Sequence, residues 1–302
     1  MSASSIRCRE RRRERSRSTG CAINLPADNS LPRSLALTET ANVPELGHAS
    51  ITWQGNEVAT VAIRNAGPLN VLSAAVMEDV RSAITHVSSD PRLRVLVVRG
   101  QGDDAFVAGA DVREMVDLDG PGATAFITRL YALCESVRNC PVPVIARLSG
   151  YCLGGGLQLA ASCDIRLAAQ GTRFGMPEVR VGMASIIHSA LLPRLAGWAE
   201  AKWLLLTGEQ IGTEEALRCG IATRVVPMEQ LDQAINDTAA AILACGPNSI
   251  REQKRLLRRW ESESIDQAIS GSIPLFAEAF ASGEPQRYLR AFIDARRPGT
   301  ST

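Results

Sequence analysis

The sequence predicts an α/β fold in which a parallel sheet is followed by a helical C-terminal region. Strand-like apolar runs alternate with helical patterns from about residue 51 onward, and the strand-like runs cease after Pro227. Two glycine-bearing loops each follow a strand-like run and lead into a helical one. This alternation is typical of parallel sheets, whose functional sites lie in loops at the carboxyl ends of the strands.

The first half of the chain carries a local signal for each expected element. Residues 51–63 are predicted to form a hairpin whose turn is Gln54-Gly55-Asn56. Ser73 is the expected N-cap of a helix that extends to about Val87, and Asp90-Pro91 ends it. The next elements are expected, in order, as a strand over 95–98, a helix over about 122–138, a strand over 144–148 and a short helix ending near Ala161.

Helical periodicity dominates the chain after Pro227. Four helices are expected, at about 228–245, 247–260, 264–281 and 284–296. They are expected to form a tail on the core rather than an independent domain. The chain therefore divides into an arginine-rich extension over 1–47, a core over 48–227 and a helical region over 228–298.

The arginine-rich stretch at residues 7–17 differs from the rest of the chain. It has no apolar periodicity and precedes a turn-rich segment over 24–44, so disorder is expected there. It lacks the apolar region of a secretory signal, and its two glutamates argue against an organelle-targeting peptide. A solvated tail is favoured over an RNA-binding arm, and the protein is expected to be cytoplasmic.

Composition argues against several classes of function. The 302 residues include 33 basic and 32 acidic side chains, and this near balance argues against a nucleic-acid partner. No uninterrupted apolar run approaches the roughly 20 residues that span a bilayer, so no membrane partner is expected. The eight cysteines form no CxxC pair, and three histidines are too few for a histidine-rich metal site. We therefore expect no metal.

Two loops give the first indication of chemistry: Phe106-Val107-Ala108-Gly109-Ala110-Asp111 and Gly150-Tyr151-Cys152-Leu153-Gly154-Gly155-Gly156. Backbone N–H groups can polarise a carbonyl oxygen only where no bulky side chain blocks its approach, which is why Gly and Ala recur at such sites. A lone triple glycine before a helix more often marks a tight connection. As a pair, the loops predict the two halves of an oxyanion hole for a carbonyl or thioester substrate.

The order of the surrounding segments strengthens this interpretation. The first loop follows VLVVRG at 95–100, the second follows PVIARL at 143–148, and CDIRLA at 163–168 comes next. In this order the chain resembles the crotonase family, also called the enoyl-CoA hydratase/isomerase family, over roughly residues 48–298. The resemblance implies a crotonase-like ββα spiral core with a C-terminal helical trimerisation region, which closes the pocket and the oligomer interface. It also implies an acyl-CoA substrate, no cofactor beyond the coenzyme A that the substrate carries, and a homotrimer or dimer of trimers.

The resemblance assigns the oxyanion donors to one residue in each loop. The expected donors are the N–H groups of Ala108 and Gly155. Gly155 lies at a predicted helix start, where the helix dipole adds to the stabilisation of an enolate. Losing one such donor typically costs about 3–4 kcal/mol of transition-state stabilisation.

Coenzyme A is expected along residues 106–111 and 69–72. By resemblance, the residues that bind it are Leu69, Phe106, Ala108, Ala110, Asp111 and Gly155. Family members often place a lysine against the phosphates near the C-terminus. The matching position is Ala295, and Arg296 or Arg297 could substitute for the lysine.

The two family carboxylates are the point at which this sequence departs from the pattern. Typical hydratases carry a glutamate two residues after the triple glycine, where this chain has Gln158, while the second carboxylate is present in Pro177-Glu178. Hydration divides its proton transfers between two groups, whereas moving a double bond from the 3 to the 2 position needs one base. A glutamine can hold a water but cannot exchange a proton at neutral pH. Isomerisation with Glu178 as the base is therefore favoured.

A bulky run at 181–195 replaces the glycine-rich run that is common in hydratases, and is expected to reshape the acyl pocket. It contains His188, and because histidine is the side chain that ordinarily titrates near neutral pH, His188 is a candidate second acid/base. The alternative is a histidine hydrogen-bonded within a helix over 185–195. Three functions stay open: an isomerase using Glu178, a hydratase or related lyase in which Gln158 or His188 replaces the missing carboxylate, and a non-catalytic acyl-CoA-binding protein.

Overall fold

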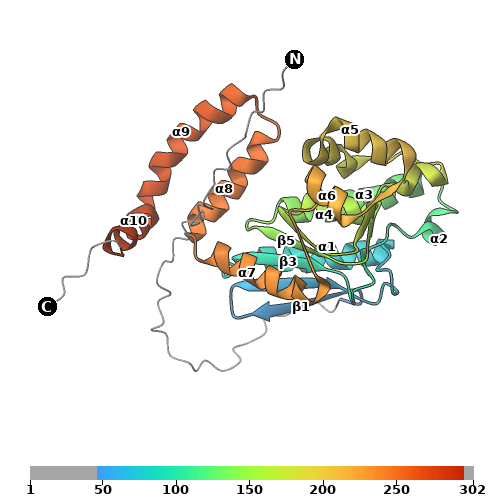
Figure 1. Cartoon of the computed structure of the whole chain (residues 1–302), viewed down its shortest axis with the longest axis horizontal. Helices are drawn as coiled ribbons and strands as arrows, with labels where there is room; N and C mark the ends of the chain where they lie inside the picture. Colours follow the sequence, from blue (N-terminus) through green and yellow to red (C-terminus); the bar gives the residue numbers. More distant parts are fainter. Residues whose placement is uncertain (1–45, 296–302) are drawn as a thin grey trace, which may run out of the picture.

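The computed structural model describes residues 46–295, which form two sheets and the helices around them (Figure 1). The larger sheet has the strand order β1 (Ala49–Gln54), β2 (Val58–Ile63), β3 (Val95–Arg99), β5 (Val144–Leu148), β7 (Ile165–Ala169) and β10 (Arg224–Val226). The smaller has the order β4 (Ala105–Val107), β6 (Tyr151–Leu153), β8 (Arg173–Gly175) and β9 (Gln210–Ile211). The β1–β2 hairpin and the β8–β9 pair are antiparallel, and the other neighbours are parallel. The arginine-rich stretch, Arg296 and Arg297 lie outside the described residues.

The chain passes repeatedly from the larger sheet to the smaller one. β3, β5 and β7 are each followed shortly by a strand of the smaller sheet, namely β4, β6 and β8. Gly150, at the β5–β6 crossing, has φ 57°, and a Cβ added there would lie 1.8 Å from the carbonyl oxygen of Asp104. Only glycine fits a left-handed backbone that is packed so closely. Helical segments follow each strand pair, so the predicted ββα spiral core is confirmed.

Side-chain caps fix where the two long core helices begin. In α1 (Ala74–Ser88), Ser73 Oγ accepts a hydrogen bond from the Val76 N–H at 3.2 Å, which confirms the predicted N-cap. In α3 (Gly120–Arg138), the Asp119 carboxylate accepts from the Gly122 N–H at 2.8 Å, so this helix begins two residues before the predicted start. The other helical segments of the core are α2 (Val112–Met115), α4 (Gly155–Ser162), η1 (Pro177–Val181), η2 (Ile187–Leu191), α5 (Leu192–Thr207), α6 (Thr213–Cys219) and η3 (Met228–Gln230).

The continuous helix predicted over residues 185–195 is wrong. Ile187 adopts a left-handed backbone with φ 49°, which interrupts any helical path that enters from Ser185. The 3-10 turn η2 follows, and α5 begins only at Leu192 and is kinked at Gly197, where φ is 76°. The segment before Ile187 is consequently a loop, which borders the cavity described below.

The four predicted C-terminal helices are present. They are α7 (Leu231–Leu243), α8 (Pro247–Trp260), α9 (Ile265–Ala281) and α10 (Glu284–Asp294). α7 covers the larger sheet, where Leu231 and Ile235 belong to the same buried cluster as Val97 of β3. α8, α9 and α10 extend away from the two sheets (Figure 1). No helix within residues 46–295 combines the length and the apolar character needed to cross a bilayer.

Lys254 attaches α8 to the core. The residue is only 5% exposed, and its Nζ donates hydrogen bonds to Asp164 Oδ2 at 2.7 Å and to the Val142 carbonyl oxygen at 2.8 Å. A buried ammonium is tolerated only where it is paired and hydrogen-bonded. These contacts therefore fix the position of α8, from which α9 and α10 continue.

Candidate active site

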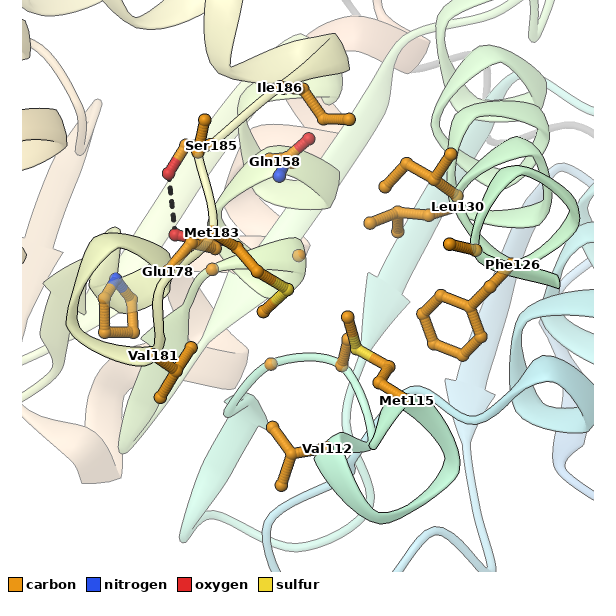
Figure 2. A pocket seen from close by; sticks show the side chains of 18 of the residues that line it. Val112, Met115, Phe126, Leu130, Gln158, Glu178, Val181, Met183, Ser185 and Ile186 are labelled. Carbon is orange, nitrogen blue, oxygen red and sulfur yellow. Dashed lines mark hydrogen bonds between the residues drawn. The ribbon is translucent and has the colours of Figure 1, made fainter. Parts of the chain in front are cut away.

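A cavity of about 660 Å³ lies where the two glycine loops meet α2, α3 and η1 (Figure 2). Most of its wall is apolar. The large apolar side chains are Val112, Met115, Leu118, Phe126, Ile127, Leu130, Val181, Met183 and Ile186. Glu178 and Ser185 face Phe126 and Leu130 across the cavity (Figure 2). The site therefore combines a small polar region with a long apolar wall, as expected of a pocket for a largely apolar ligand.

The first glycine loop offers a different N–H group from the one predicted. The Ala108 N–H donates to the Leu69 carbonyl oxygen at 3.0 Å, so it is already engaged and the prediction of Ala108 as a donor is corrected. Leu72 donates to the Gly109 carbonyl oxygen at 2.9 Å and accepts from the Asp111 N–H at 2.9 Å.

The two hydrogen bonds of Leu72, to Gly109 and Asp111, form a parallel bridge between Leu72 and Ala110. In such a bridge the N–H of Ala110 points away from Leu72. Ala110 lines the cavity, and its N–H makes no hydrogen bond within residues 46–295. The first loop therefore presents the N–H of Ala110 to the cavity, two residues after the predicted donor. Regular alternation along an extended segment would point the N–H groups of Ala108 and Ala110 to the same side, so no local sequence signal distinguishes the two. Gly109, with φ 129°, lies between them.

The second glycine loop presents the N–H of Gly155 to the cavity. Gly154 adopts φ 52° and ψ −122°, and α4 begins at Gly155, so the Gly155 N–H belongs to the first helical turn. N–H groups in the first turn of a helix have no partner within the helix and carry the positive end of its dipole. Gln158 N–H donates back to the Gly154 carbonyl oxygen at 3.0 Å, whereas no described residue accepts from Gly155. Gly155 also lines the cavity.

Cys152, within the second loop, has no access to the cavity. Its side chain is fully buried, and burial raises the pKa of its thiol. The thiol therefore stays protonated at neutral pH, and Cys152 is a packing residue.

Glu178 lies directly beside the second loop. It is on η1, immediately after β8, and a Cβ added to Gly154 would be 2.8 Å from Glu178 Oε1. Its Oε2 accepts a hydrogen bond from Ser185 Oγ at 2.8 Å (Figure 2). Sequence reasoning missed Ser185, because the run over 181–195 also contains Ser189 and nothing local distinguishes the two hydroxyls. Glu178 thus lies next to Gly155, at the polar end of the cavity.

Gln158 lines the same cavity from α4. The residue is only 3% exposed, and its Oε1 has no hydrogen-bond partner within residues 46–295. Leaving a buried polar group unpaired typically costs about 1–3 kcal/mol. Its amide is therefore suited to hydrogen-bond a ligand or a water in the cavity, although it cannot exchange a proton.

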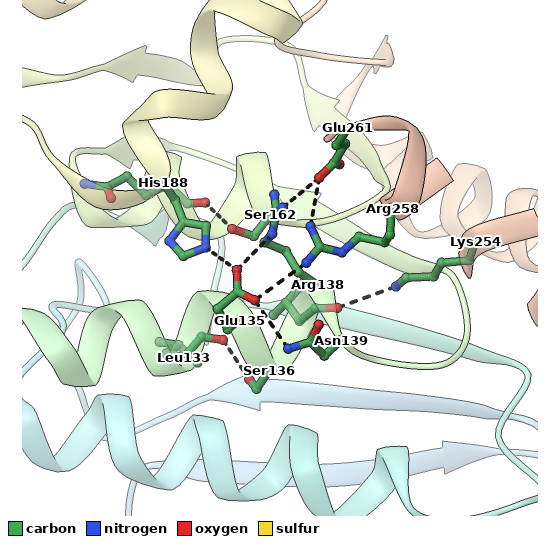
Figure 3. Close-up of polar contacts among 12 residues, drawn as sticks. Leu133, Glu135, Ser136, Arg138, Asn139, Ser162, His188, Lys254, Arg258 and Glu261 are labelled. Carbon is green, nitrogen blue, oxygen red and sulfur yellow. Dashed lines mark hydrogen bonds and ion pairs between the residues drawn. The ribbon is translucent and has the colours of Figure 1, made fainter. Parts of the chain in front are cut away.

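His188 does not join this group. It is buried on η2, and its Nε2 lies 2.9 Å from Glu135 Oε1 on α3 (Figure 3). Glu135 also pairs with Arg138 at 3.0 Å. His188 is not among the residues that line the cavity. The left-handed turn at Ile187 separates it from the loop beside Glu178, so the proposal of His188 as a second acid/base is corrected.

The residues predicted to bind coenzyme A separate into different environments. Ala108, Ala110 and Gly155 line the cavity. Phe106 is 0% exposed, so its predicted contact with coenzyme A is corrected: it is a core residue. Leu69 is 39% exposed beside the first loop, and Asp111 caps α2 by accepting from the Arg113 N–H at 2.9 Å. Ala295, at the predicted position of the phosphate-binding lysine, is the C-cap of α10.

The chain is similar to proteins of one family over most of its length. The family model of enoyl-CoA hydratase/isomerase matches residues 54–300. A crotonyl-CoA hydratase of Syntrophomonas wolfei is 34% identical over 245 residues, which are 80% of this chain and 93% of that protein. A short-chain-enoyl-CoA hydratase of Clostridium acetobutylicum is 31% identical over 254 residues, covering 84% of this chain and 97% of that protein.

Solved structures give the same result for the fold. An enoyl-CoA hydratase from Bacillus anthracis superposes with a TM-score of 0.79 at 27% identity, over 83% of this chain and 98% of that one. Pseudomonas aeruginosa DspI superposes with a TM-score of 0.78 at 28% identity, over 86% of this chain and 99% of that one. The similarity therefore includes the sheets, the loops and most of the helical region.

Proposed function

Because this chain belongs to the enoyl-CoA hydratase/isomerase family and is an enzyme of that family, we propose that it moves a carbon–carbon double bond within an acyl-CoA thioester, with Glu178 as its single base. One observation carries the choice of reaction. Glu178 is the only carboxylate among the described residues that line the cavity. The position that holds a second glutamate in typical hydratases is Gln158, whose amide does not transfer protons.

The proposed reaction starts with the thioester carbonyl oxygen between the N–H groups of Ala110 and Gly155. These donors stabilise negative charge on the oxygen, which acidifies the α carbon. Glu178 removes a proton from the α carbon of a 3-enoyl thioester and returns it to the γ carbon, so the double bond ends between carbons 2 and 3. Coenzyme A arrives as part of the substrate, and no separate cofactor takes part in the proposed reaction.

Hydration of a 2-enoyl thioester is the second candidate, and two observations favour it. Relatives that are 34% and 31% identical are named as hydratases. The unpaired amide of Gln158 could also hold a water near Glu178. In this reaction Glu178 would both take the proton of the water and supply the proton of the α carbon.

A paired assay distinguishes the two reactions. The purified protein is incubated with 3-enoyl-CoA and 2-enoyl-CoA substrates of several chain lengths, and the products are separated by liquid chromatography. Conversion of the 3-enoyl substrate without formation of 3-hydroxyacyl-CoA supports the isomerase. Formation of 3-hydroxyacyl-CoA from the 2-enoyl substrate supports the hydratase, and activity on neither substrate contradicts both.

Gln158→Glu tests whether the amide limits hydration. A second carboxylate beside Glu178 supplies the missing proton-transfer group, so we expect the rate of 2-enoyl-CoA hydration to rise about a hundredfold. The measurement is the initial rate of 3-hydroxyacyl-CoA formation. Gln158→Leu is the control, because it removes the amide without adding an acid, and it is expected to give no gain. An unchanged hydration rate in Gln158→Glu would contradict the limiting role of the amide.

We propose that the protein is a homotrimer or a dimer of trimers, assembled through its helical region. α9 carries an exposed apolar stripe formed by Ile265, Ile269, Ile273 and Phe276, and it buries none of its own residues. Contiguous exposed apolar surface of this kind usually marks an interface. Light scattering is expected to give three or six times the chain mass of 32.4 kDa. A double change, Ile269→Glu with Ile273→Glu, should lower that mass, and a monomeric wild-type protein would contradict the proposal.

A further inference from the structure

Ser185 makes the only side-chain hydrogen bond to Glu178 within residues 46–295. Its Oγ donates to Glu178 Oε2 at 2.8 Å, and both side chains line the cavity (Figure 2). A hydrogen bond donated to a carboxylate stabilises the charged form and restricts its rotation. The contact therefore acts on the group that carries the proton in the proposed reaction.

The two carboxylate oxygens of Glu178 lie in different surroundings. Oε2 accepts from Ser185, whereas Oε1 lies over Gly154: a Cβ placed on Gly154 would be 2.8 Å from Oε1 and 3.9 Å from Oε2. Gly154 directly precedes Gly155, the donor of the second loop. Oε1 is thus the oxygen closer to the backbone that would hold the thioester carbonyl.

The loop that carries Ser185 is held by hydrogen bonds on both sides of this residue. Before it, the Met183 N–H donates to the Glu178 carbonyl oxygen at 3.0 Å. After it, the Ser189 hydroxyl donates to the Ile186 carbonyl oxygen at 2.8 Å. A hydroxyl on a fixed segment can hold a carboxylate in one orientation more accurately than a hydroxyl on a mobile segment.

Other charged groups near Glu178 are engaged elsewhere. Arg180, on the same 3-10 helix, also lines the cavity, but its guanidinium pairs with Glu209. His188, on η2, contacts Glu135 of α3 at 2.9 Å. α4 contributes no charged side chain to the cavity. The Ser185 hydroxyl is therefore the group best placed to control the carboxylate.

We propose that Ser185 is a positioning residue, which fixes Oε2 of Glu178 and leaves Oε1 as the oxygen that takes and returns the substrate proton. This inference rests on the proposed function, in which Glu178 is the base. The proton that Oε1 takes from the α carbon is the one that it returns to the γ carbon. Glu178 ends the cycle ionised, and Ser185 keeps its own hydrogen throughout.

Ser185→Ala and Ser185→Thr test this role, since alanine removes the donor and threonine keeps it. In Ser185→Ala we expect kcat to fall about tenfold with KM nearly unchanged. Ser185→Thr should restore kcat. Ser89→Ala, which removes an exposed hydroxyl that donates to the His86 carbonyl oxygen at the end of α1, away from the cavity, should leave kcat unchanged.

A spectrum that needs no activity separates this inference from the proposed function. The protein is labelled with ¹³C-glutamate, and the Glu178 carboxyl resonance is assigned by its absence in Glu178→Gln. At neutral pH this resonance is expected to move in Ser185→Ala, which lacks the hydrogen bond, and to return in Ser185→Thr, which restores it. An unmoved resonance in Ser185→Ala, or a threonine variant as impaired as the alanine one, would overturn the role of Ser185. A wild-type protein inactive on both enoyl-CoA substrates would instead refute the proposed function, while a moved resonance would still support the contact.

Discussion

Glu178→Gln is expected to lower the turnover of an enoyl-CoA substrate about a thousandfold and to leave acyl-CoA affinity nearly unchanged. Glutamine matches glutamate in size and can still accept a hydrogen bond from Ser185, but it cannot take a proton. Glu178 is also the only carboxylate lining the cavity among the described residues, so no neighbour can replace it. The two measurements are kcat from product formation and the Kd of an acyl-CoA from calorimetry.

Glu209→Gln is the matched control for this change. Glu209 pairs with Arg180, a neighbour of Glu178 on η1, and is not among the residues lining the cavity. Exposed ion pairs contribute little, so we expect kcat within about twofold of the wild type. Wild-type turnover in Glu178→Gln would exclude Glu178 as the base. A parallel loss of turnover and acyl-CoA binding would point to a structural role instead.

Gly150→Ala is expected to destabilise the fold by about 3 kcal/mol or more. The left-handed φ of 57° is unfavourable for alanine, and the added Cβ would meet the Asp104 carbonyl oxygen at 1.8 Å. Backbone on both sides must move to accommodate it, and the β5–β6 crossing also sets the position of the second glycine loop. Urea unfolding at a fixed protein concentration measures the change in the free energy of unfolding.

Gly171→Ala separates backbone strain from the steric clash. Gly171 lies at the corresponding β7–β8 crossing with φ 87°, but an added Cβ there would meet no atom within 4 Å. We expect this variant to lose only about 1 kcal/mol, the cost of the left-handed backbone alone. Equal destabilisation of the two variants would mean that the close packing at Gly150 relaxes.

The elements that sequence predicted well are those set by neighbouring residues. The β1–β2 hairpin, the Ser73 cap and the four C-terminal helices all follow from local turn, cap and periodicity signals. The hairpin turn, Gly55-Asn56-Glu57, lies one residue after the predicted one, because Gln54 pairs with Val58 as the last residue of β1. The glycine loops were located for the same reason, because each lies between a strand and a helix. Gly155 and Glu178 lie together at the cavity because their loops follow adjacent parallel strands, β6 and β8.

The features that sequence placed incorrectly depend on partners distant in the chain. Ala108 loses its N–H to Leu69, and only that pairing reveals that Ala110 faces the cavity. Similarly, the helix expected around His188 is interrupted by the left-handed Ile187, and the imidazole contacts Glu135 on α3. No local pattern encodes these contacts, because they arise when separate elements pack together.

Lys254 is one of two lysines in the chain, and Lys202 is the other. Lysine amines are common targets of acylation, and a thioester is an acylating reagent. The ammonium of Lys254 is held out of water by Asp164, whereas Lys202 is exposed on α5. Within residues 46–295, Lys202 is thus the only lysine whose amine is accessible to a thioester. Chemical acylation of the enzyme's lysines by its own substrates would therefore be confined to that one surface position.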